Sequence, residues 1–445
     1  MLNVQVRQVS VETIKPSTPT PDDRKTHKLC FLDQFMPALY TTIILFYNTS
    51  NAHDKVLQLK ESLSQTLTKF YPLAGKIYED NIVIDCNDEG IPFSVAHADF
   101  SLLEFLKEPN VQLLQHFLPS KRVPTKPITE LPLLTIQVTV FTCGGLAIGG
   151  CFNHKILDGA SIGCFLKNWA ATLRGHDVGV VCPDFVAGSK DFPPIENIPS
   201  PGKKQLISPI TYDSCKLRWY VFDQSAIQAL KTEARSEKVP NPTRVEVVSA
   251  FMWKHLTAKS KYLNNVSTSM DEKTSLLSLA VNLRKHALSP NLKNSIGNLM
   301  LPTYATISSH QIGEELNVII GKVHEAISRV DEEYVRKLHG EDGMKMMWES
   351  VELWSHDRET RFMCSSWCNL GIDDADFGWG KPLWVSPWGE PEDLERHLLV
   401  LMDRNGGGGI EAWIVLQEQE IVALESDEEF TNFAVPAIGI CMPTS

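Results

Sequence analysis

The sequence has no long apolar run and no closely paired cysteines. No stretch approaches the roughly 20 consecutive apolar residues that span a bilayer, and the opening MLNVQVRQVS lacks the apolar core of a secretory signal. We therefore expect a soluble, cytoplasmic protein without a membrane partner. The ten cysteines form no Cys-x-x-Cys pair, and Cys364 and Cys368 come nearest to one. This pattern predicts reduced, mostly buried thiols and no bound metal.

Clustered positive charge is also missing. Lys and Arg number 42 against 54 Asp and Glu, which gives a formal net charge of -12. A nucleic-acid partner is therefore not expected, because phosphate binding requires clustered Lys and Arg. The chain does contain ample apolar material, since 43% of its 445 residues are hydrophobic. That is enough for two ordinary domains or for one large domain with a cleft.

A stretch rich in Pro, Ser and Gly divides the chain. It reads DFPPIENIPSPGKKQLISPITYDS over residues 191–214 and predicts a crossover linker between an N-terminal lobe, 1–190, and a C-terminal lobe, 215–445. A strand then starts at Leu217. Thr243 and Glu246 next form the capping box of a helix.

Hydrophobic periodicity indicates helices and antiparallel strands in both lobes. Helical spacing joins Val56, Leu59, Leu63, Leu67 and Phe70, and again Leu316, Ile319, Ile320, Val323 and Ile327. LTIQVTVF alternates, turns at 142–145 and returns as LAIGGCFNH, which predicts a hairpin ending at His154. RHLLVLMD and IEAWIVLQ, joined by a glycine-rich turn at 405–409, predict another. The order of elements favours mixed α/β lobes over a doubly wound fold.

Two catalytic signatures overlap in GGCFNHKILDGASIGCF, residues 149–165. His154 and Asp158 form a His-x-x-x-Asp, a spacing typical of a general base in certain acyl transferases. Gly159, Ser161 and Gly163 form a Gly-x-Ser-x-Gly, the pattern of a hydrolase nucleophile elbow. The two signatures predict different enzymes.

His154 has a structural and a chemical interpretation. It could be a hydrogen-bonded core histidine, on the strand side of Leu146, Ile148 and Phe152. Its place at a strand end favours a rigid base that faces a cleft. Asp158 stands where a helix N-cap belongs, which favours a structural role over proton transfer.

Ser161 is poorly placed for a nucleophile elbow. An elbow needs a strand that runs straight into a tight turn with the serine at its apex, whereas Ser161 is expected in the first turn of a helix. The small residues there are equally explained by close packing of the helix start. A serine hydrolase stays open as an alternative, because Asp and His partners follow in the required order.

The sequence resembles the BAHD family, plant enzymes that move acyl groups from coenzyme A thioesters to alcohols or amines. HKILDG at 154–159 and DFGWG at 376–380 are the motifs that carry the resemblance, and supporting stretches run from ETIKPSTPTP at 12 through LDQ at 32, FYPLAGK at 70, DCND at 85 and VNLRK at 281 to SSWC at 365. The first half is most similar to the alkaloid-acetylating branch. The YFGNC signature of the malonyl-transferring branch reads SIGNL here, at 295–299, which disfavours malonyl-CoA.

The resemblance implies a chloramphenicol-acetyltransferase-like fold, with two similar-sized α/β lobes, a long crossover and a central solvent channel. Acyl-CoA, here acetyl-CoA, enters from one face as co-substrate and a small alcohol from the other. His154 matches the general base, so that the acceptor attacks the thioester directly. No permanent cofactor and a monomer are expected, and no short motif identifies the CoA contacts.

The remaining site residues are also implied by the resemblance. Asp158 is expected to pair with Arg284 and to fix the turn that carries the histidine. Asp376 is expected to brace a loop that shapes the CoA side, with Gly378 and Gly380 permitting a tight turn.

The SSWC stretch carries two further candidates. Trp367 is either an oxyanion donor, helped by Ser365, or a core aromatic. An amine acceptor, and a silent binding protein with the same fold, remain alternatives to alcohol acylation.

Overall fold

The computed structural model describes most of the chain. The described residues are 5–78, 83–175, 181–195, 215–263, 274–285, 290–308, 311, 313–338, 340–355, 361–388, 395–404 and 407–437. Residues 196–214 of the predicted crossover lie outside them.

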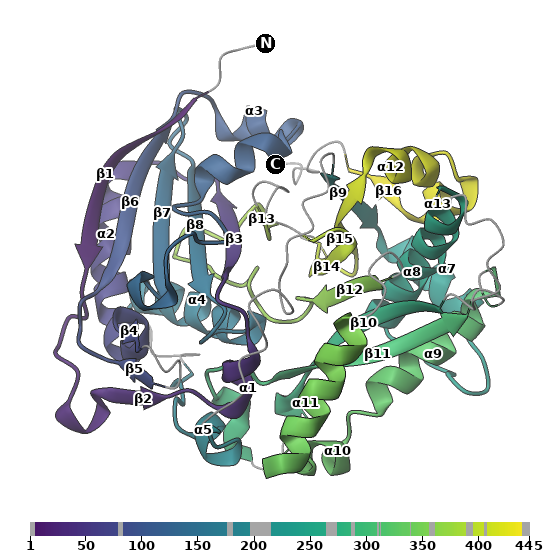
Figure 1. Ribbon diagram of the computed structural model, residues 1–445. Coiled ribbons are helices and arrows are strands. Elements are labelled where there is room, and N and C mark those ends of the chain that lie inside the picture. Colours follow the sequence, from purple (N-terminus) through teal and green to yellow (C-terminus); the bar gives the residue numbers. More distant parts are fainter. Residues whose placement is uncertain are drawn as a thin grey trace.

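The first half of the chain builds a six-stranded sheet (Figure 1). Its strands, in spatial order, are β1 (Val6–Ile14), β6 (Ile91–Ala98), β7 (Leu134–Val140), β8 (Leu146–Asn153), β3 (Tyr40–Tyr47) and β13 (Trp384–Ser386). Helices α2 (Ala52–Lys69) and α4 (Gly159–Leu173) share one hydrophobic core with this sheet. The edge strand β13 comes from the second half of the chain, and Trp384 pairs with Phe46 of β3. The two halves are therefore joined through a shared sheet as well as by side-chain packing.

The second half builds a seven-stranded mixed sheet. Its strands, in spatial order, are β11 (Met300–Ser308), β10 (Thr274–Asn282), β12 (Arg361–Ser366), β14 (Leu398–Asp403), β15 (Ile410–Gln417), β9 (Cys215–Phe222) and β16 (Val435–Pro436). The apolar core of this lobe also includes residues of α7 (Gln224–Glu233), α8 (Arg244–Leu263), α9 (Leu316–Ser328), α12 (Glu418–Glu425) and α13 (Glu428–Phe433). Along β15, Ala412 and Ile414 belong to this helix-covered core, whereas Trp413 belongs to the core of the first lobe. The period of two along a strand thus gives the sheet one face toward its helices and one toward the other lobe.

A third, smaller core joins the lobes below the two sheets. It brings α1 (Phe31–Phe35) and α5 (Ala187–Asp191) against segments of the second half, among them α10 (Glu332–Arg336) and α11 (Gly340–Ser355). Phe35 meets Trp348 of α11 edge to face, with ring centroids 6.2 Å apart. Leu299 lies in the same core, directly after the SIGN residues. Helix α1 is therefore packed against the second lobe, next to the SIGN residues at 295–298.

Short elements complete the fold. A three-stranded sheet has the order β2 (Thr26–Lys28), β5 (Val83–Asp85), β4 (Lys76–Ile77), and α3 (Leu102–Lys107) follows β6. Turns of 3-10 helix occur at Asp22–Arg24, Tyr71–Ala74, Val111–Phe117, Ile128–Glu130, Leu283–Lys285 and Pro290–Asn294.

The mixed α/β, two-lobed fold predicted from the sequence is confirmed. Both predicted hairpins are present, as β7 with β8 and β14 with β15. The capping box is also present, since the Thr243 backbone N–H donates to Glu246 at 2.7 Å and the Glu246 N–H donates to the Thr243 hydroxyl at 3.2 Å. Two ends differ from the prediction. β8 ends at Asn153, so His154 is the first residue after the strand, and β9 begins at Cys215 rather than at Leu217.

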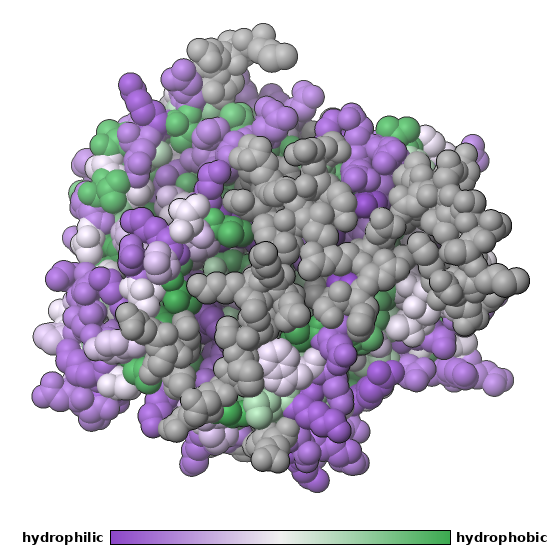
Figure 2. All heavy atoms as spheres, in the orientation of Figure 1, coloured by the Kyte–Doolittle hydropathy of each residue, from purple (hydrophilic) through white to green (hydrophobic). Residues whose placement is uncertain are grey.

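Polar residues dominate the coloured part of the face drawn in Figure 2, where hydrophobic residues gather only in small patches. Among the described residues, no helix has both the length and the apolar character that crossing a membrane requires. In the same part of the chain the cysteines are free thiols, and no group of three His, Cys, Asp or Glu side chains is arranged to hold a metal.

Candidate active site

The turn between β8 and α4 places His154 at the end of a central strand. The His154 backbone N–H donates to the Leu39 carbonyl at 2.8 Å, which continues the pairing of β8 with β3. The Asn153 carbonyl accepts from the N–H groups of Ile156 and Leu157 at 3.1 and 3.3 Å, which closes the turn. The backbone of the histidine is therefore fixed on both sides.

The imidazole of His154 has a defined partner and keeps partial exposure. Its Nδ1 atom lies 3.0 Å from Oδ1 of Asn298. Burial lowers the pKa of His154, and nearby Arg122 acts in the same direction. A hydrogen bond to the backbone of His154 itself, the charge of Asp158 and the Asn298 hydrogen bond oppose them. A lowered pKa keeps the imidazole neutral at neutral pH, as a general base requires.

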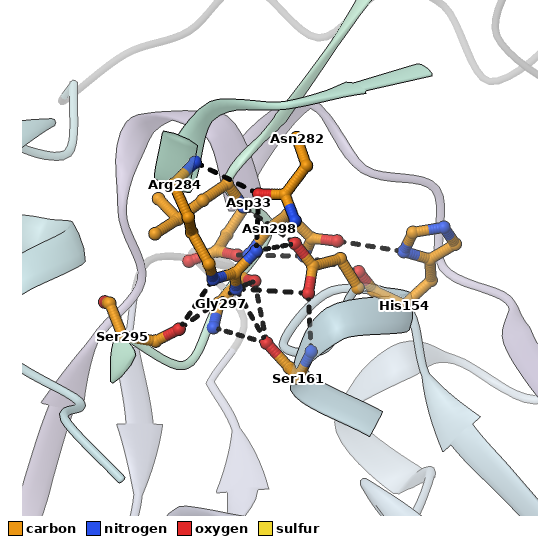
Figure 3. A network of polar contacts seen from close by, with 10 residues as sticks. Asp33, His154, Ser161, Asn282, Arg284, Ser295, Gly297 and Asn298 are labelled. Carbon is orange, nitrogen blue, oxygen red and sulfur yellow. Dashed lines mark hydrogen bonds and ion pairs between the residues drawn. The ribbon is translucent and has the colours of Figure 1, made fainter. Parts of the chain in front are cut away.

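Asp158 caps α4 and binds Arg284 at the same time (Figure 3). Its Oδ1 accepts from the Ser161 N–H at 2.8 Å, and Arg284 donates from Nη1 to Oδ2 at 2.7 Å and from Nη2 to Oδ1 at 3.1 Å. The Leu299 N–H adds a bond to Oδ2 at 3.1 Å. Burial raises the pKa of Asp158, but the charge of Arg284 and the hydrogen bonds from Arg284 and Ser161 together outweigh burial, and the pKa is lowered. Asp158 is thus an ionised anchor with its oxygens occupied.

Arg284 spans the lobes from the second half of the chain. Beyond Asp158, its guanidinium donates to the carbonyls of Ser295 and Gly297 and to the Ser161 hydroxyl, at 3.0 to 3.1 Å. In Figure 3 these partners surround the Arg284 guanidinium: Ser161 comes from the start of α4, and Ser295 and Gly297 come from the loop before β11. The predicted pairing of Asp158 with Arg284 is therefore observed, as part of a larger interlobe network.

Ser161 is one of the buried members of this network. Its hydroxyl donates to the Gly297 carbonyl at 3.1 Å and accepts from the Gly297 N–H at 3.2 Å and from Arg284 at 3.0 Å. Within the described part of the chain, no histidine forms a hydrogen bond with this hydroxyl. Ser161 lies in the first turn of α4, as expected, so its geometry is that of an interlobe bridge and not of a nucleophile elbow.

The glycines around Ser161 are explained by close packing. A methyl group on Gly163 would lie 2.2 Å from the Leu370 carbonyl oxygen, and one on Gly159 would lie 2.8 Å from Cδ1 of Leu370. Both distances are too short for real contacts. At Gly163 the near atom belongs to the backbone of the loop after β12, so this position requires glycine, whereas at Gly159 the Leu370 side chain would have to move. This packing accounts for the Gly-x-Ser-x-Gly pattern without a nucleophile.

Ser365 lies in β12 (Arg361–Ser366), and Trp367 is the first residue after that strand. A methyl group on Gly159 would lie 3.8 Å from the indole nitrogen of Trp367, so this edge of the ring faces the first residue of α4. Both side chains are partly buried. Among the described residues, neither the indole N–H nor the Ser365 hydroxyl forms a hydrogen bond, so both donors are unused within the protein.

The DFGWG motif closes its own turn. Oδ1 of Asp376 accepts from the N–H groups of Gly378 and Gly380 at 2.8 and 2.9 Å, and both glycines have positive φ, +94° and +97°. Phe377 packs edge to face on Trp169 of α4, with centroids 5.1 Å apart. The motif thus fastens this loop to the first lobe, and neither of these hydrogen bonds involves His154.

Two residues of the site, Asn298 and Asp33, were not identified as site residues from the sequence. Nδ2 of Asn298 donates to the His154 carbonyl at 2.7 Å and to Oδ1 of Asp33 at 2.9 Å, and its backbone N–H donates to the same oxygen at 2.7 Å. Both stretches, LDQ and SIGNL, were noted only for their family resemblance. The contact itself spans 265 positions of sequence, so no local pattern reports it.

A polar groove lies beside Asn369, in the loop that follows β12. It encloses about 460 Å³. Its lining residues are Gln228, Lys231, Arg235, Asn241, Pro242, Thr243, Arg244 and Asn369. The α8 N-terminus opens into this groove, and Arg244 also binds Asn369 and Asp403. Cations beside a helix N-terminus form a surface that suits phosphate groups.

Comparisons with known proteins agree with this geometry. A model of the Transferase family matches residues 4–431. Akuammiline synthase 2 of Alstonia scholaris is 36% identical, covering 96% of both chains, and limonoid 7-O-acetyltransferase of Citrus sinensis is 37% identical, covering 96% of this chain and 97% of its own. The crystal structure of vinorine synthase superposes with a TM-score of 0.82 at 31% identity, over 96% of this chain and 98% of the other.

A more distant structure, F. sporotrichioides TRI101 complexed with coenzyme A and T-2, shares the fold, with a TM-score of 0.71 at 20% identity over 92% of this chain and 99% of the other. The family match and these relatives extend over nearly the whole chain. The chain therefore belongs to the Transferase family, the acyltransferases also known as the BAHD family.

Proposed function

We propose that the protein transfers an acetyl group from acetyl-CoA to a hydroxyl of a plant specialised metabolite, an alkaloid or a terpenoid. The observation that carries the proposal is His154, whose imidazole stands directly after the end of β8, is oriented by Asn298 through Nδ1 and has its pKa lowered by burial. Relatives named limonoid 7-O-acetyltransferase and stemmadenine O-acetyltransferase favour a hydroxyl over an amine as the acceptor. The DFGWG turn and the Asp158 pair support the site without entering the chemistry.

Proton transfer falls to Nε2 of His154, because Nδ1 faces Asn298. The acceptor hydroxyl gives its proton to Nε2 as its oxygen attacks the thioester carbonyl. The carbon–sulfur bond then breaks, and the imidazolium protonates the departing CoA thiolate. No acyl-enzyme forms, so the protein supplies no nucleophile, and Ser161 needs no chemical role.

The tetrahedral intermediate carries a negative oxygen that needs a donor. The Trp367 indole N–H and the Ser365 hydroxyl are the open donors on β12 and its continuation, and we assign them to this oxygen. We assign the phosphates of CoA to the groove of Lys231, Arg235 and Arg244. Asn369, two residues after Trp367 in the sequence, is one of the residues that line that groove.

A thiol-release assay tests this function. The protein is mixed with acetyl-CoA and a panel of hydroxylated alkaloids and limonoid-type terpenoids, and a thiol reagent reports free CoA. We expect release that depends on the acceptor. His154→Ala should lower the rate by about 10²- to 10⁴-fold, the usual contribution of a general base, whereas Ser161→Ala should retain most of it. The opposite pattern would instead identify a serine hydrolase.

The CoA assignment has its own test. Lys231→Ala and Arg235→Ala should raise the KM for acetyl-CoA several-fold and leave kcat unchanged, because phosphate contacts bind ground state and transition state equally. Lys190→Ala, on α5, is the matched control for removal of a surface cation. A lowered kcat with an unchanged KM would contradict the assignment.

The family resemblance further favours a cytoplasmic monomer with acyl-CoA and a small alcohol as its partners. The chain divides into lobes 1–190 and 215–445 in this proposal, with β13 exchanged into the first sheet. Size-exclusion chromatography with light scattering tests the monomer.

A further inference from the structure

The side-chain amide of Asn298 has one chemically sensible orientation. Its Nδ2 atom lies 2.9 Å from the Asp33 carboxylate and 2.7 Å from the His154 carbonyl. Both are acceptors, and the two hydrogens of an amide nitrogen satisfy them. The opposite orientation would set the amide oxygen against two other oxygens in a site from which water is excluded, because Asn298 is 0% exposed.

This orientation decides where His154 carries its proton. With Nδ2 committed, Oδ1 of Asn298 faces Nδ1 of His154 at 3.0 Å. An amide oxygen only accepts, so Nδ1 must donate and must hold the single proton of the neutral ring. The lone pair is then on Nε2, the atom left for the acceptor hydroxyl.

Asp33 holds the amide in place from the other side. The same oxygen that accepts from Nδ2 accepts from the Asn298 backbone N–H at 2.7 Å, and Oδ2 accepts from the Cys30 N–H at 2.8 Å. Burial raises the pKa of Asp33, and the hydrogen bonds from Cys30 and Asn298 counter it. Lys155, whose Nζ donates to the Gln34 carbonyl at 2.7 Å, adds positive charge nearby. Each hydrogen-bonding partner therefore presents a donor to this carboxylate.

We propose that Asp33 and Asn298 are positioning residues that lock His154 in the Nδ1–H tautomer, in the order carboxylate, amide, imidazole. The proposal rests on the proposed function, since the tautomer matters because Nε2 serves as the base. It reaches beyond the His-x-x-x-Asp motif. Asp158 binds Arg284 and caps α4, and the group that orients the imidazole comes from α1 and from the loop before β11.

The tautomer is directly measurable in the unaltered protein. Protein labelled with nitrogen-15 histidine gives separate ring-nitrogen signals for protonated and unprotonated positions, and comparison with His154→Gln identifies those of His154 among the 13 histidines. We expect a protonated Nδ1 and an unprotonated Nε2 at neutral pH. A resting His154 that carries its proton on Nε2 overturns the proposal, whatever the variants do.

Two variants test the lock itself. Asn298→Ala removes the acceptor, and Asp33→Asn replaces an acceptor-only group by one that also donates. In both we expect a mixture of His154 tautomers, with kcat lowered roughly 10- to 100-fold, as for other residues that orient a histidine, and with the KM for acetyl-CoA within about twofold. A lowered kcat with an unchanged Nδ1–H signal overturns the proposal, because the effect would then be merely structural.

Glu420→Gln is the matched control. Glu420 is also a buried carboxylate beside a histidine, with His397 Nε2 at 2.8 Å, but it lies on α12 in the other core. The same chemical change there should lower the melting temperature and leave the His154 signals and kcat as they are. Failure of the proposed function can be distinguished from failure of the tautomer lock, because the tautomer is measured on the resting protein without any acetyl transfer. A protein that acetylates nothing yet shows the Nδ1–H signal still has the lock.

Discussion

Arg284 donates to both carboxylate oxygens of Asp158, at 2.7 and 3.1 Å, across the boundary between the lobes. Asp158 precedes α4 of the first lobe, and Arg284 follows β10 of the second. Both side chains are almost fully buried, with 4% and 9% of their surface exposed. A buried ion pair adds little net stability over an apolar pair of the same shape, but removal of one partner leaves an uncompensated charge.

Asp158→Asn should therefore destabilise the protein by about 3–5 kcal/mol and abolish most activity through the displaced turn. Asp158→Asn combined with Arg284→Gln should recover part of that stability, because no buried charge remains. Urea unfolding and acyl transfer, measured on the same preparations, check both. Loss of activity in a fully stable Asp158→Asn protein would give Asp158 a direct chemical role.

Gly163 offers a test of the packing explanation for the Gly-x-Ser-x-Gly pattern. Gly163→Ala should cost about 1–3 kcal/mol, as overpacking does, because the new methyl group meets the Leu370 carbonyl. Activity should fall with it, since Leu370 belongs to the loop that follows Trp367. Gly321→Ala is the matched control in another helix, α9, where a methyl group would meet nothing within 4 Å. It should stabilise by about 0.5–1 kcal/mol, and equal effects of the two changes would refute the packing argument.

The oxyanion assignment predicts a selective loss in Trp367→Phe. Phenylalanine keeps the aromatic volume but removes the N–H, so kcat should fall at least about tenfold while the KM for acetyl-CoA stays within twofold. Trp253→Phe is the control, because Trp253 donates its N–H to Ser275 at 2.9 Å in the core of the second lobe. It should cost about 1 kcal/mol of stability and leave kcat unchanged. An unchanged kcat in Trp367→Phe would make Trp367 a core aromatic.

Local patterns predicted the local structure. The Asp158 cap, the helical position of Ser161 and both hairpins depend on spacings of a few residues, and all are present. The division into two lobes followed from the Pro-, Ser- and Gly-rich stretch at 191–214 and from the family motifs, and the pairing of Asp158 with Arg284 followed from the motifs. These features are encoded within one element or within one recognisable motif.

Contacts between distant segments that the family motifs do not imply were not predictable from one sequence. Asn298 reaches both His154 and Asp33 because the third core holds α1 against the loop before β11. Such a contact depends on how two lobes dock, and hydrophobic periodicity contains no information on docking. The insertion of β13 into the first sheet was missed for the same reason, since three residues of strand give almost no periodic signal.

That insertion produces an interlobe contact with a measurable pH dependence. Trp384 of β13 donates its indole N–H to Glu411 of β15 at 3.3 Å, and burial raises the pKa of Glu411 from 4.5 to about 7. A raised pKa means that the folded state binds a proton that the unfolded state has already released between pH 4.5 and 7. Stability therefore falls as pH rises through this window, and the full cost is present above pH 7.

Glu411→Gln should remove that cost, because a neutral amide can still accept from Trp384. At pH 8 the variant should be more stable than the natural protein by about 1–3 kcal/mol, a range reduced for the partial exposure of Glu411, and the difference should vanish near pH 4.5. Glu418→Gln removes an exposed carboxylate paired with Lys216, and it should change stability by less than about 0.5 kcal/mol. Thermal unfolding of the three proteins from pH 4.5 to 8 separates these outcomes. A constant difference across that range would mean that Glu411 keeps its ordinary ionisation and that Trp384 is bound by a charged carboxylate throughout.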